Sequence, residues 1–205
     1  MTKIYVARHG QNIDNANGIL NGHRDEPLTP LGEQQARTVG EEIAQARLHF
    51  DVVYSSPLQR ALKTAELISE VVRTSRPIVE PDLIERDFGI MTGRKIKEIE
   101  LLCAPDIIKT DTITYFLSPE GAETFPDLII RADRFLKRIE SQHAGQSVLL
   151  VCHGDFGKML YAVFYGLNWQ DVLIDFHFGN SEVLYLAENS RPEERRMFIS
   201  AQSNY

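Results

Sequence analysis

Short apolar runs alternate along the chain with longer stretches in which apolar residues recur every three or four positions. The runs are typical of buried strands, and the longer stretches are typical of helices with one apolar face. The strongest strand signal is the run Ser-Val-Leu-Leu-Val-Cys at 147–152, which holds no charged residue. Strands are predicted at 3–7, 51–55, 77–80, 146–152, 182–186 and 196–199, and helices at 30–47, 57–72, 125–143 and from 154 onward.

The order of these elements predicts an α/β fold. Strands that alternate with helices form a mostly parallel sheet with helices on both faces, which is a three-layer, doubly wound arrangement. The 205 residues suffice for one sizeable core, so we expect a single domain over 1–205. Loops are predicted at 11–27 and 83–89, and a polar link at 191–195. The least regular part, about 90–125, is expected to hold a short helix at 94–102 and to form a variable cover segment.

Local capping signals mark the starts of three predicted helices. Thr29 followed by Pro30 predicts an N-cap with proline at the first helical position. The stretch Ser-Pro-Leu-Gln at 56–59 fits a capping box, again with proline at the first position. Asp155 is expected either to cap the helix that follows the 146–152 strand or to face a pocket, where its charge would weaken the binding of a polyanion.

Composition and charge narrow the classes of function. The net charge of −7 provides no basic field for nucleic acid or an anionic membrane, so an anionic ligand requires a local cluster of cations. No stretch reaches the ~18 apolar residues of a membrane span, and the N-terminal run is too short for a secretion signal. The two cysteines are Cys103 and Cys152, and the second lies in a predicted buried strand. We therefore expect no disulfide framework and a reducing, cytoplasmic location.

Cationic and imidazole residues follow three of the predicted strands. Arg8 and His9 come directly after the first strand. Arg60 lies one helical turn beyond the second strand, and His153 directly follows the strand at 146–152. Because ligands of open parallel sheets bind at the carboxyl ends of the strands, these side chains are expected to converge on one rim. Arg60 opposes the dipole of its own helix, which indicates a functional reason for its position.

Several motifs carry a resemblance to a known family over nearly the whole chain. They are Arg8-His9-Gly10 after an N-terminal strand, Asn15, Gly22, Leu28-Thr29-Pro30-Leu31-Gly32, Ser55-Ser56-Pro57-Leu58-Gln59-Arg60-Ala61 with Thr64-Ala65, Glu85-Arg86-Asp87-Phe88-Gly89 and Val151-Cys152-His153-Gly154. In this order the motifs resemble those of the histidine phosphatase superfamily. Within it, the chain is similar to the branch of cofactor-dependent phosphoglycerate mutases and fructose-2,6-bisphosphatase-like enzymes.

The residue types suit transfer of a phosphoryl group. A neutral imidazole is a good phosphoryl acceptor, so His9 is the predicted nucleophile. Arginine neutralises the oxygens of the transferring group well, because its planar fork meets two oxygens at once. The resemblance assigns to Glu85 the protonation of the leaving alkoxide and the activation of water, which requires a raised pKa. The predicted catalytic residues are Arg8, His9, Arg60, Glu85 and His153, and the predicted phosphate- or substrate-binding residues are Arg8, Asn15, Gly22, Arg60, Arg86, His153 and Gly154.

Each of these residues also has a plainer interpretation. Glu85 can be a solvated ion-pair partner of Arg86, and Arg86 either contacts substrate or is surface charge. A metal held by His9 and His153 stays open, but the chain lacks the paired spacings HxxxH and CxxC, so neither a metal nor another cofactor is expected. Surface or packing roles are expected for the remaining histidines, His23, His49, His143 and His177.

The cover segment bears most on the reaction. Mutases that resemble this chain carry a longer insert there with clustered arginines, whereas this segment has Arg94, Lys95, Lys97 and Lys109 without an arginine pair. A mutase must keep water from the phosphohistidine and a phosphatase must admit it, so the arginine-poor cover favours hydrolysis. We therefore expect a metal-independent phosphatase acting on a small phosphorylated metabolite, with a phosphoglycerate mutase as the alternative.

Four further points stay open from the sequence. A phosphate-binding module without turnover and a protein-phosphohistidine phosphatase are both compatible with the motifs. Edge strands near the C-terminus would allow a homodimer. Asn12 stands where the resembling family usually has serine or threonine, so its contact with phosphate is in question.

Overall fold

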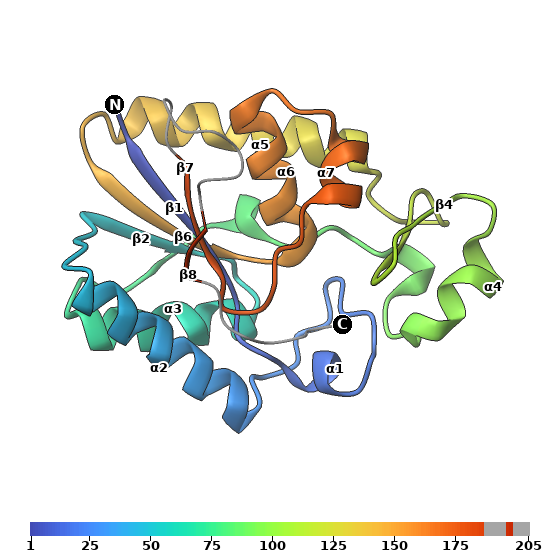
Figure 1. Ribbon diagram of the computed structural model, residues 1–205, viewed down its shortest axis with the longest axis horizontal. Helices are drawn as coiled ribbons and strands as arrows, with labels where there is room; N and C mark the ends of the chain where they lie inside the picture. Colours follow the sequence, from blue (N-terminus) through green and yellow to red (C-terminus); the bar gives the residue numbers. More distant parts are fainter. Residues whose placement is uncertain (187–195, 199–205) are drawn as a thin grey trace.

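A central sheet of six strands organises the described part of the protein, which comprises residues 1–186 and the backbone of 196–198 in this computed structural model (Figure 1). The strands are β1 (Lys3–Arg8), β2 (Val52–Ser55), β3 (Ile78–Val79), β6 (Ser147–Cys152), β7 (Val183–Leu186) and β8 (Arg196–Phe198). Their order is β3-β2-β6-β1-β7-β8, with the first four parallel and β7 and β8 antiparallel to their neighbours. The predicted mostly parallel sheet is confirmed, whereas the polar link expected at 191–195 lies outside the described residues.

Helices cover both faces of the sheet, so the predicted three-layer arrangement is confirmed (Figure 1). The helices are α2 (Pro30–Gln45) and α3 (Gln59–Val72) on one face, and α5 (Phe125–Gln142), α6 (Gly154–Tyr165) and α7 (Trp169–Asp175) on the other. Each face has its own apolar core. Alternate residues of the buried strand β6 contribute to the two cores, Val148 and Leu150 to the α5–α6 side and Leu149 and Val151 to the α2–α3 side.

One of the capping predictions needs correction. Thr29 caps α2 as expected, since its hydroxyl accepts the Gly32 backbone N–H. The capping box at 56–59 is wrong: α3 begins at Gln59, its N-cap is Leu58, and no side chain caps it. The Ser56 hydroxyl accepts the backbone N–H of Leu58 at 3.3 Å, just before the helix, and it lies 2.7 Å from the imidazole of His153. It therefore joins the ends of β2 and β6.

The connections hold more regular structure than the sequence predicts. A short helix, α1 (Ile13–Ala16), lies within the predicted loop at 11–27. The loop at 83–89 runs between two 3-10 turns, η1 (Pro81–Leu83) and η2 (Gly89–Met91). In the cover segment, the structure has η3 (Ile96–Glu98), α4 (Ile99–Cys103), and the two-stranded sheet of β4 (Ile107–Lys109) and β5 (Thr114–Phe116). That the chain forms one domain with this cover stays a prediction.

The carboxyl ends of three parallel strands meet at one edge of the main sheet. Arg8 pairs with Cys152, and Ser55 pairs with Val151. The backbone N–H of His9 also donates to the Cys152 carbonyl at 3.0 Å. Residues that follow β1, β2 and β6 are thereby brought to one place. Both cysteines are free and buried, and no helix in the described ranges is long and apolar enough to cross a membrane.

Candidate active site

His9 lies at the end of β1 with its ring oriented by a backbone carbonyl. Its Nδ1 donates a hydrogen bond to the Gly10 carbonyl at 2.7 Å, which places the proton on Nδ1 and the lone pair on Nε2. Arg60 Nε donates to that lone pair at a distance of 3.3 Å. Burial, followed by the charges of Arg60 and Arg8, holds the pKa of His9 well below its usual value. The imidazole is therefore neutral at neutral pH, and its Nε2 lone pair carries no proton and accepts only the long contact from Arg60.

Arg60 is completely buried in the first turn of α3, and backbone carbonyls fix its guanidinium. Nη1 donates to the Arg24 carbonyl at 2.6 Å, and Nη2 donates to the Gly22 carbonyl at 2.9 Å. Gly22 has φ +48, and a Cβ there would lie 2.9 Å from the Thr92 hydroxyl. Gly22 does not line the cavity described below, so its contact with the site is through its carbonyl. Burial lowers the pKa of Arg60 to about 10, which leaves it charged at neutral pH.

His153 lies beside His9 at the start of α6. The two ring centroids are 5.1 Å apart, so one phosphate can reach both imidazoles. Nε2 of His153 is 2.7 Å from the Ser56 hydroxyl, and Nδ1 is buried without a partner among the described residues. Burial and the charge of Arg60 keep the pKa of His153 well below its usual value.

Arg8 and Asn15 complete the cluster around the His9 ring. Arg8 donates through Nη1 to the Phe178 carbonyl at 2.6 Å, whereas its buried Nε has no partner within the described ranges. The Asn15 side-chain oxygen accepts from the Asn180 amide at 3.2 Å, which leaves the Asn15 amide nitrogen available for a ligand. Asn180 Nδ2 also donates to the His9 carbonyl at 3.0 Å. Sequence reasoning missed Asn180, because it lies in no motif.

Asn12 has a structural position rather than a place on the cavity wall. Its side chain caps α1 by accepting the Asn15 backbone N–H, and its amide donates to the side-chain oxygen of Asn21 at 2.5 Å. It is fully buried and does not line the cavity. Asn12, which stands where the resembling family usually has serine or threonine, therefore caps a helix in this protein.

Glu85 lines the same cavity as His9 and lies on the loop that follows η1. One carboxyl oxygen accepts the backbone N–H groups of Arg86 at 2.9 Å and Phe156 at 3.0 Å, and the other accepts that of Asp155 at 3.3 Å. Glu85 is only 6% exposed. Burial and the nearby Asp155 carboxylate raise its pKa, although the backbone donors counteract part of this rise. A raised pKa favours the protonated form of the carboxyl group, which a proton donor requires.

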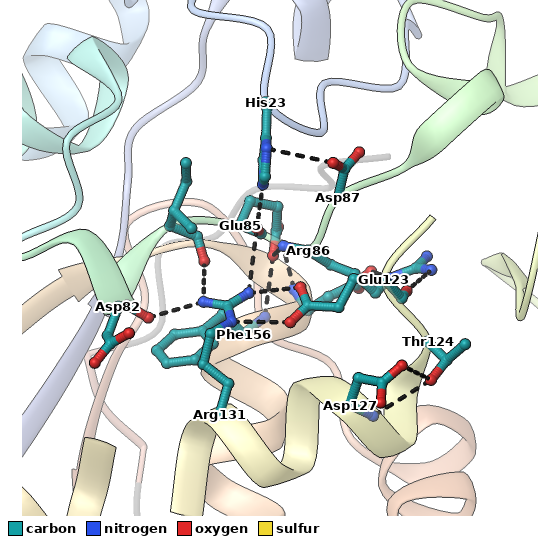
Figure 2. A network of polar contacts seen from close by, with 12 residues as sticks. His23, Asp82, Glu85, Arg86, Asp87, Glu123, Thr124, Asp127, Arg131 and Phe156 are labelled. Atoms are coloured by element: carbon teal, nitrogen blue, oxygen red, sulfur yellow. Dashed lines mark hydrogen bonds and ion pairs between the residues drawn. The ribbon is translucent and has the colours of Figure 1, made fainter. Parts of the chain in front are cut away.

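The backbone of Glu85 is held by a polar network that the sequence did not reveal (Figure 2). Arg131 on α5 donates to the carbonyls of Asp82 and Ile84 at 2.8 Å each and to that of Glu85 at 3.3 Å. Glu123 holds Arg131 in place through a bidentate ion pair, with N–O distances of 2.9 and 2.7 Å. His23, expected to have a surface or packing role, donates through Nε2 to the same Glu85 carbonyl at 2.8 Å.

Arg86 pairs with a different carboxylate from the one considered in the sequence. Its Nε donates to Asp155 at 2.9 Å, and its side chain is buried. The rings of Phe88, Phe116 and Phe125 surround its guanidinium, with centroids 4.3–4.9 Å away. Asp155 therefore faces the cavity and pairs with Arg86, while His153 is the N-cap residue of α6. Neither the surface-charge interpretation of Arg86 nor capping by Asp155 is correct.

These groups surround a cavity of about 150 Å³. At one end lie Arg8, His9, Asn15 and Arg60, with Gly154 where the backbone of α6 approaches them. The His153 side chain is not part of the lining. The other end is mainly apolar and includes the cover segment, with Ile19, Leu20, Phe88, Ile96, Ile99, Ile113, Tyr115 and Phe116. The cavity therefore combines a cationic pole with a wall suited to an organic group.

Comparisons with known proteins agree with this geometry. Residues 4–195 match the profile of the histidine phosphatase superfamily (branch 1). The chain belongs to this superfamily. A 2,3-bisphosphoglycerate-dependent phosphoglycerate mutase of Rhizobium etli is 31% identical over 179 residues, which cover 84% of this chain and 85% of that protein.

Two phosphatases are similar to this histidine phosphatase as well. A candidate phosphoserine phosphatase of Hydrogenobacter thermophilus is 31% identical and covers 89% of this chain and 88% of its own length. The crystal structure of a phosphoserine phosphatase from Entamoeba histolytica with 3-phosphoglyceric acid has a TM-score of 0.73 at 26% identity, over 90% of each chain. Relatives named for both activities therefore match most of this chain.

Proposed function

We propose that this histidine phosphatase hydrolyses small phosphomonoesters through a phosphohistidine at His9. The observation that supports this best is the pair of buried nitrogens, Arg8 Nε and His153 Nδ1, that have no partner among the described residues. Both belong to residues beside the lone pair of a neutral imidazole. Buried polar nitrogens normally have a hydrogen-bond partner. Arg8 Nε can donate to a phosphate oxygen, and so can His153 Nδ1 in the tautomer in which that nitrogen carries the proton.

The first step transfers the phosphoryl group to the enzyme. The His9 Nε2 lone pair attacks phosphorus, the N–P bond forms and the bond to the leaving oxygen breaks. Arg8, Arg60 and His153, together with the Asn15 amide, stabilise the charge on the transferring oxygens. Glu85 gives its proton to the leaving oxygen. The Gly10 carbonyl keeps accepting the Nδ1 proton and so stabilises the positive charge that develops on the ring.

The second step releases phosphate. Water attacks phosphorus, the N–P bond breaks, and the water proton passes to Glu85, which is now a carboxylate. This restores both groups to their starting protonation states. Side chains of this protein, the Gly10 carbonyl and water suffice for both steps.

The cover segment supports hydrolysis over mutase activity. The lining residues that it contributes are Ile96, Ile99 and 112–116, none of them basic. Its basic residues are exposed, and two of them pair with carboxylates of the same segment: Arg94 with Glu98, and Lys109 with Glu100. A cover without arginine at the cavity offers little to hold a second phosphorylated intermediate against water.

Phosphoglycerate mutase activity is the second candidate, because relatives such as the Rhizobium etli enzyme carry that name. We would incubate the protein with 3-phosphoglycerate and a 2,3-bisphosphoglycerate primer and measure free phosphate and 2-phosphoglycerate. Free phosphate as the main product supports the phosphatase. Conversion to 2-phosphoglycerate without free phosphate contradicts it and supports the mutase. A cytoplasmic location and a homodimer stay predictions.

Loss of the nucleophile tests the proposal in the same assay. His9→Ala should lower kcat/KM for phosphate release by about 10⁴-fold or more, since no other group can accept the phosphoryl group. His49→Ala is the matched control, because His49 is exposed. Equal activity of the His9→Ala variant and the wild type would contradict the proposal.

A further inference from the structure

Lys158 is a buried cation on the cavity wall that the proposed reaction does not use. It lies on α6, is 3% exposed and lines the cavity together with Gly154 and Asp155. Residues at i, i+3 and i+4 share one helix face, and helical side chains lean toward the N-terminus. Lys158 is therefore about 6 Å along the helix axis from Gly154, and its side chain leans back toward the phosphate end.

The ammonium group of Lys158 has spare hydrogen-bonding capacity. Nζ donates to the Tyr115 hydroxyl at 2.5 Å, and that is its one hydrogen bond within the described residues. An ammonium has three donors, so two remain for a ligand. Tyr115 lies on β5 of the cover segment and also lines the cavity, and its own hydroxyl proton is free to donate. Together the two side chains present several donors to the cavity.

The charges around the cavity show why this cation needs an anion. Arg8 and Arg60 balance a phosphate dianion. Arg86 is already paired with Asp155 at 2.9 Å, and Glu85 carries no charge while it holds the proton for the leaving oxygen. Lys158, like Arg8 and Arg60, forms no ion pair among the described residues. Once a phosphate offsets the two arginines, Lys158 is the lining cation that still lacks a counter-charge. An unpaired buried ammonium is costly, and a carboxylate would offset that cost.

We propose that Lys158 and Tyr115 bind an anionic group, of the carboxylate class, on the leaving-group side of the substrate. The inference rests on the proposed function, because it assigns the arginine end of the cavity to the phosphate. It makes Lys158 a specificity-determining residue that favours phosphorylated hydroxy acids over phosphorylated alcohols of the same size.

The protonation state of Lys158 gives this preference a pH dependence. Burial, together with the charge of Arg8 on β1, lowers the pKa of Lys158 to about 8. The carboxylates of Asp155 on the same helix, Glu85 on the loop after η1 and Glu182 beside β7 offset part of this lowering, and Tyr115 from β5 contacts the ammonium directly. Lys158 is thus charged at pH 7 and loses its charge above pH 8, so the preference for an anionic leaving group should weaken there.

A pair of near-isosteric ligands tests the inference. 3-Phosphoglycerate and glycerol 3-phosphate differ in that a carboxylate replaces a hydroxymethyl group. We expect the wild type to prefer 3-phosphoglycerate in kcat/KM at pH 7, and Lys158→Met to lower the value for 3-phosphoglycerate by about 10- to 100-fold. The value for glycerol 3-phosphate should change by less than about 3-fold, which is small against a charged hydrogen bond. Lys158→Arg should retain part of the preference.

Controls separate this inference from the function on which it rests. Lys63→Met removes an exposed charge on α3 and should leave both substrates unaffected. Calorimetry of the two ligands with the His9→Ala variant measures binding without turnover. If the His9→Ala variant binds 3-phosphoglycerate preferentially but the wild type releases no phosphate from any substrate, the Lys158 assignment is retained and the proposed phosphatase activity is overturned. Turnover or binding with equal values for the two ligands, or equal losses for both in Lys158→Met, overturns the assignment.

Discussion

The two ends of the cavity are built differently. At the phosphate end, backbone carbonyls fix the side chains: Gly10 orients His9, and Gly22 and Arg24 hold Arg60. At the opposite end, apolar side chains of the cover segment such as Ile96 and Ile113 form the wall, and packing alone sets their positions. A backbone carbonyl does not change with side-chain substitution, whereas an apolar wall does. The positions of the residues that handle the phosphate therefore depend on the backbone fold, whereas the choice of leaving group depends on side chains that substitution can change.

The largest effect on this comparison is expected from the loss of Arg60 at the phosphate end. Arg60→Met should lower kcat/KM for every phosphomonoester by about 10³-fold, because the site loses a cation that stabilises the transferring oxygens. Arg60→Lys keeps the charge but lacks the planar guanidinium, so its kcat/KM should lie between those of the wild type and Arg60→Met. Arg37→Met is the control, since Arg37 is exposed on α2. A loss confined to one substrate would place Arg60 in leaving-group recognition instead.

A smaller effect is expected from the network behind Glu85. Arg131→Met removes donors to three backbone carbonyls and should lower kcat/KM for an alkyl phosphate by about 10- to 100-fold through misplacement of the acid. An aryl phosphate leaves without a proton and should be nearly unaffected. Arg134→Met, which removes an exposed partner of Asp82, is the matched control.

The pH profile separates positioning from a merely structural role of Arg131. Activity toward an alkyl phosphate requires protonated Glu85, so kcat/KM should fall as the pH rises through the raised pKa of that carboxyl. If Arg131→Met admits water to the loop, desolvation weakens, this pKa drops, and the fall begins at lower pH. An unchanged profile with equal losses for alkyl and aryl phosphates would assign Arg131 to stability alone.

The smallest expected effect comes from a substitution in the apolar wall at the opposite end of the cavity. Ile113→Val removes one methylene from the wall and should lower kcat/KM about 4-fold for a substrate with an apolar leaving group, at ~0.8 kcal/mol per methylene. The value for a small polar substrate should not change. Ile130→Val on the exposed side of α5 is the control. Equal losses for both substrates would mean that the wall supports the fold rather than the leaving group.

Sequence patterns predicted the parts of the site that follow strand ends. Arg8, His9 and His153 adjoin strong apolar runs, so parallel pairing alone places them together. Asn180 and Arg131 could not be found in this way. Each acts by donating to backbone carbonyls of residues far away in the chain, and such contacts leave no periodic signal. The capping box predicted at 56–59 is wrong for a related reason, because the Ser56 hydroxyl contacts the imidazole of His153, which is far away in the chain.

The central claim is that the neutral His9 imidazole accepts the phosphoryl group. The most direct measurement mixes the enzyme with a phosphomonoester, stops the reaction in alkali within one turnover, and locates phosphate by mass spectrometry. The account predicts a phosphoryl group on His9 that forms at least as fast as kcat and then decays as free phosphate appears. Steady release of phosphate with no phosphorylated His9 at any time, or with the group on another residue, would contradict it.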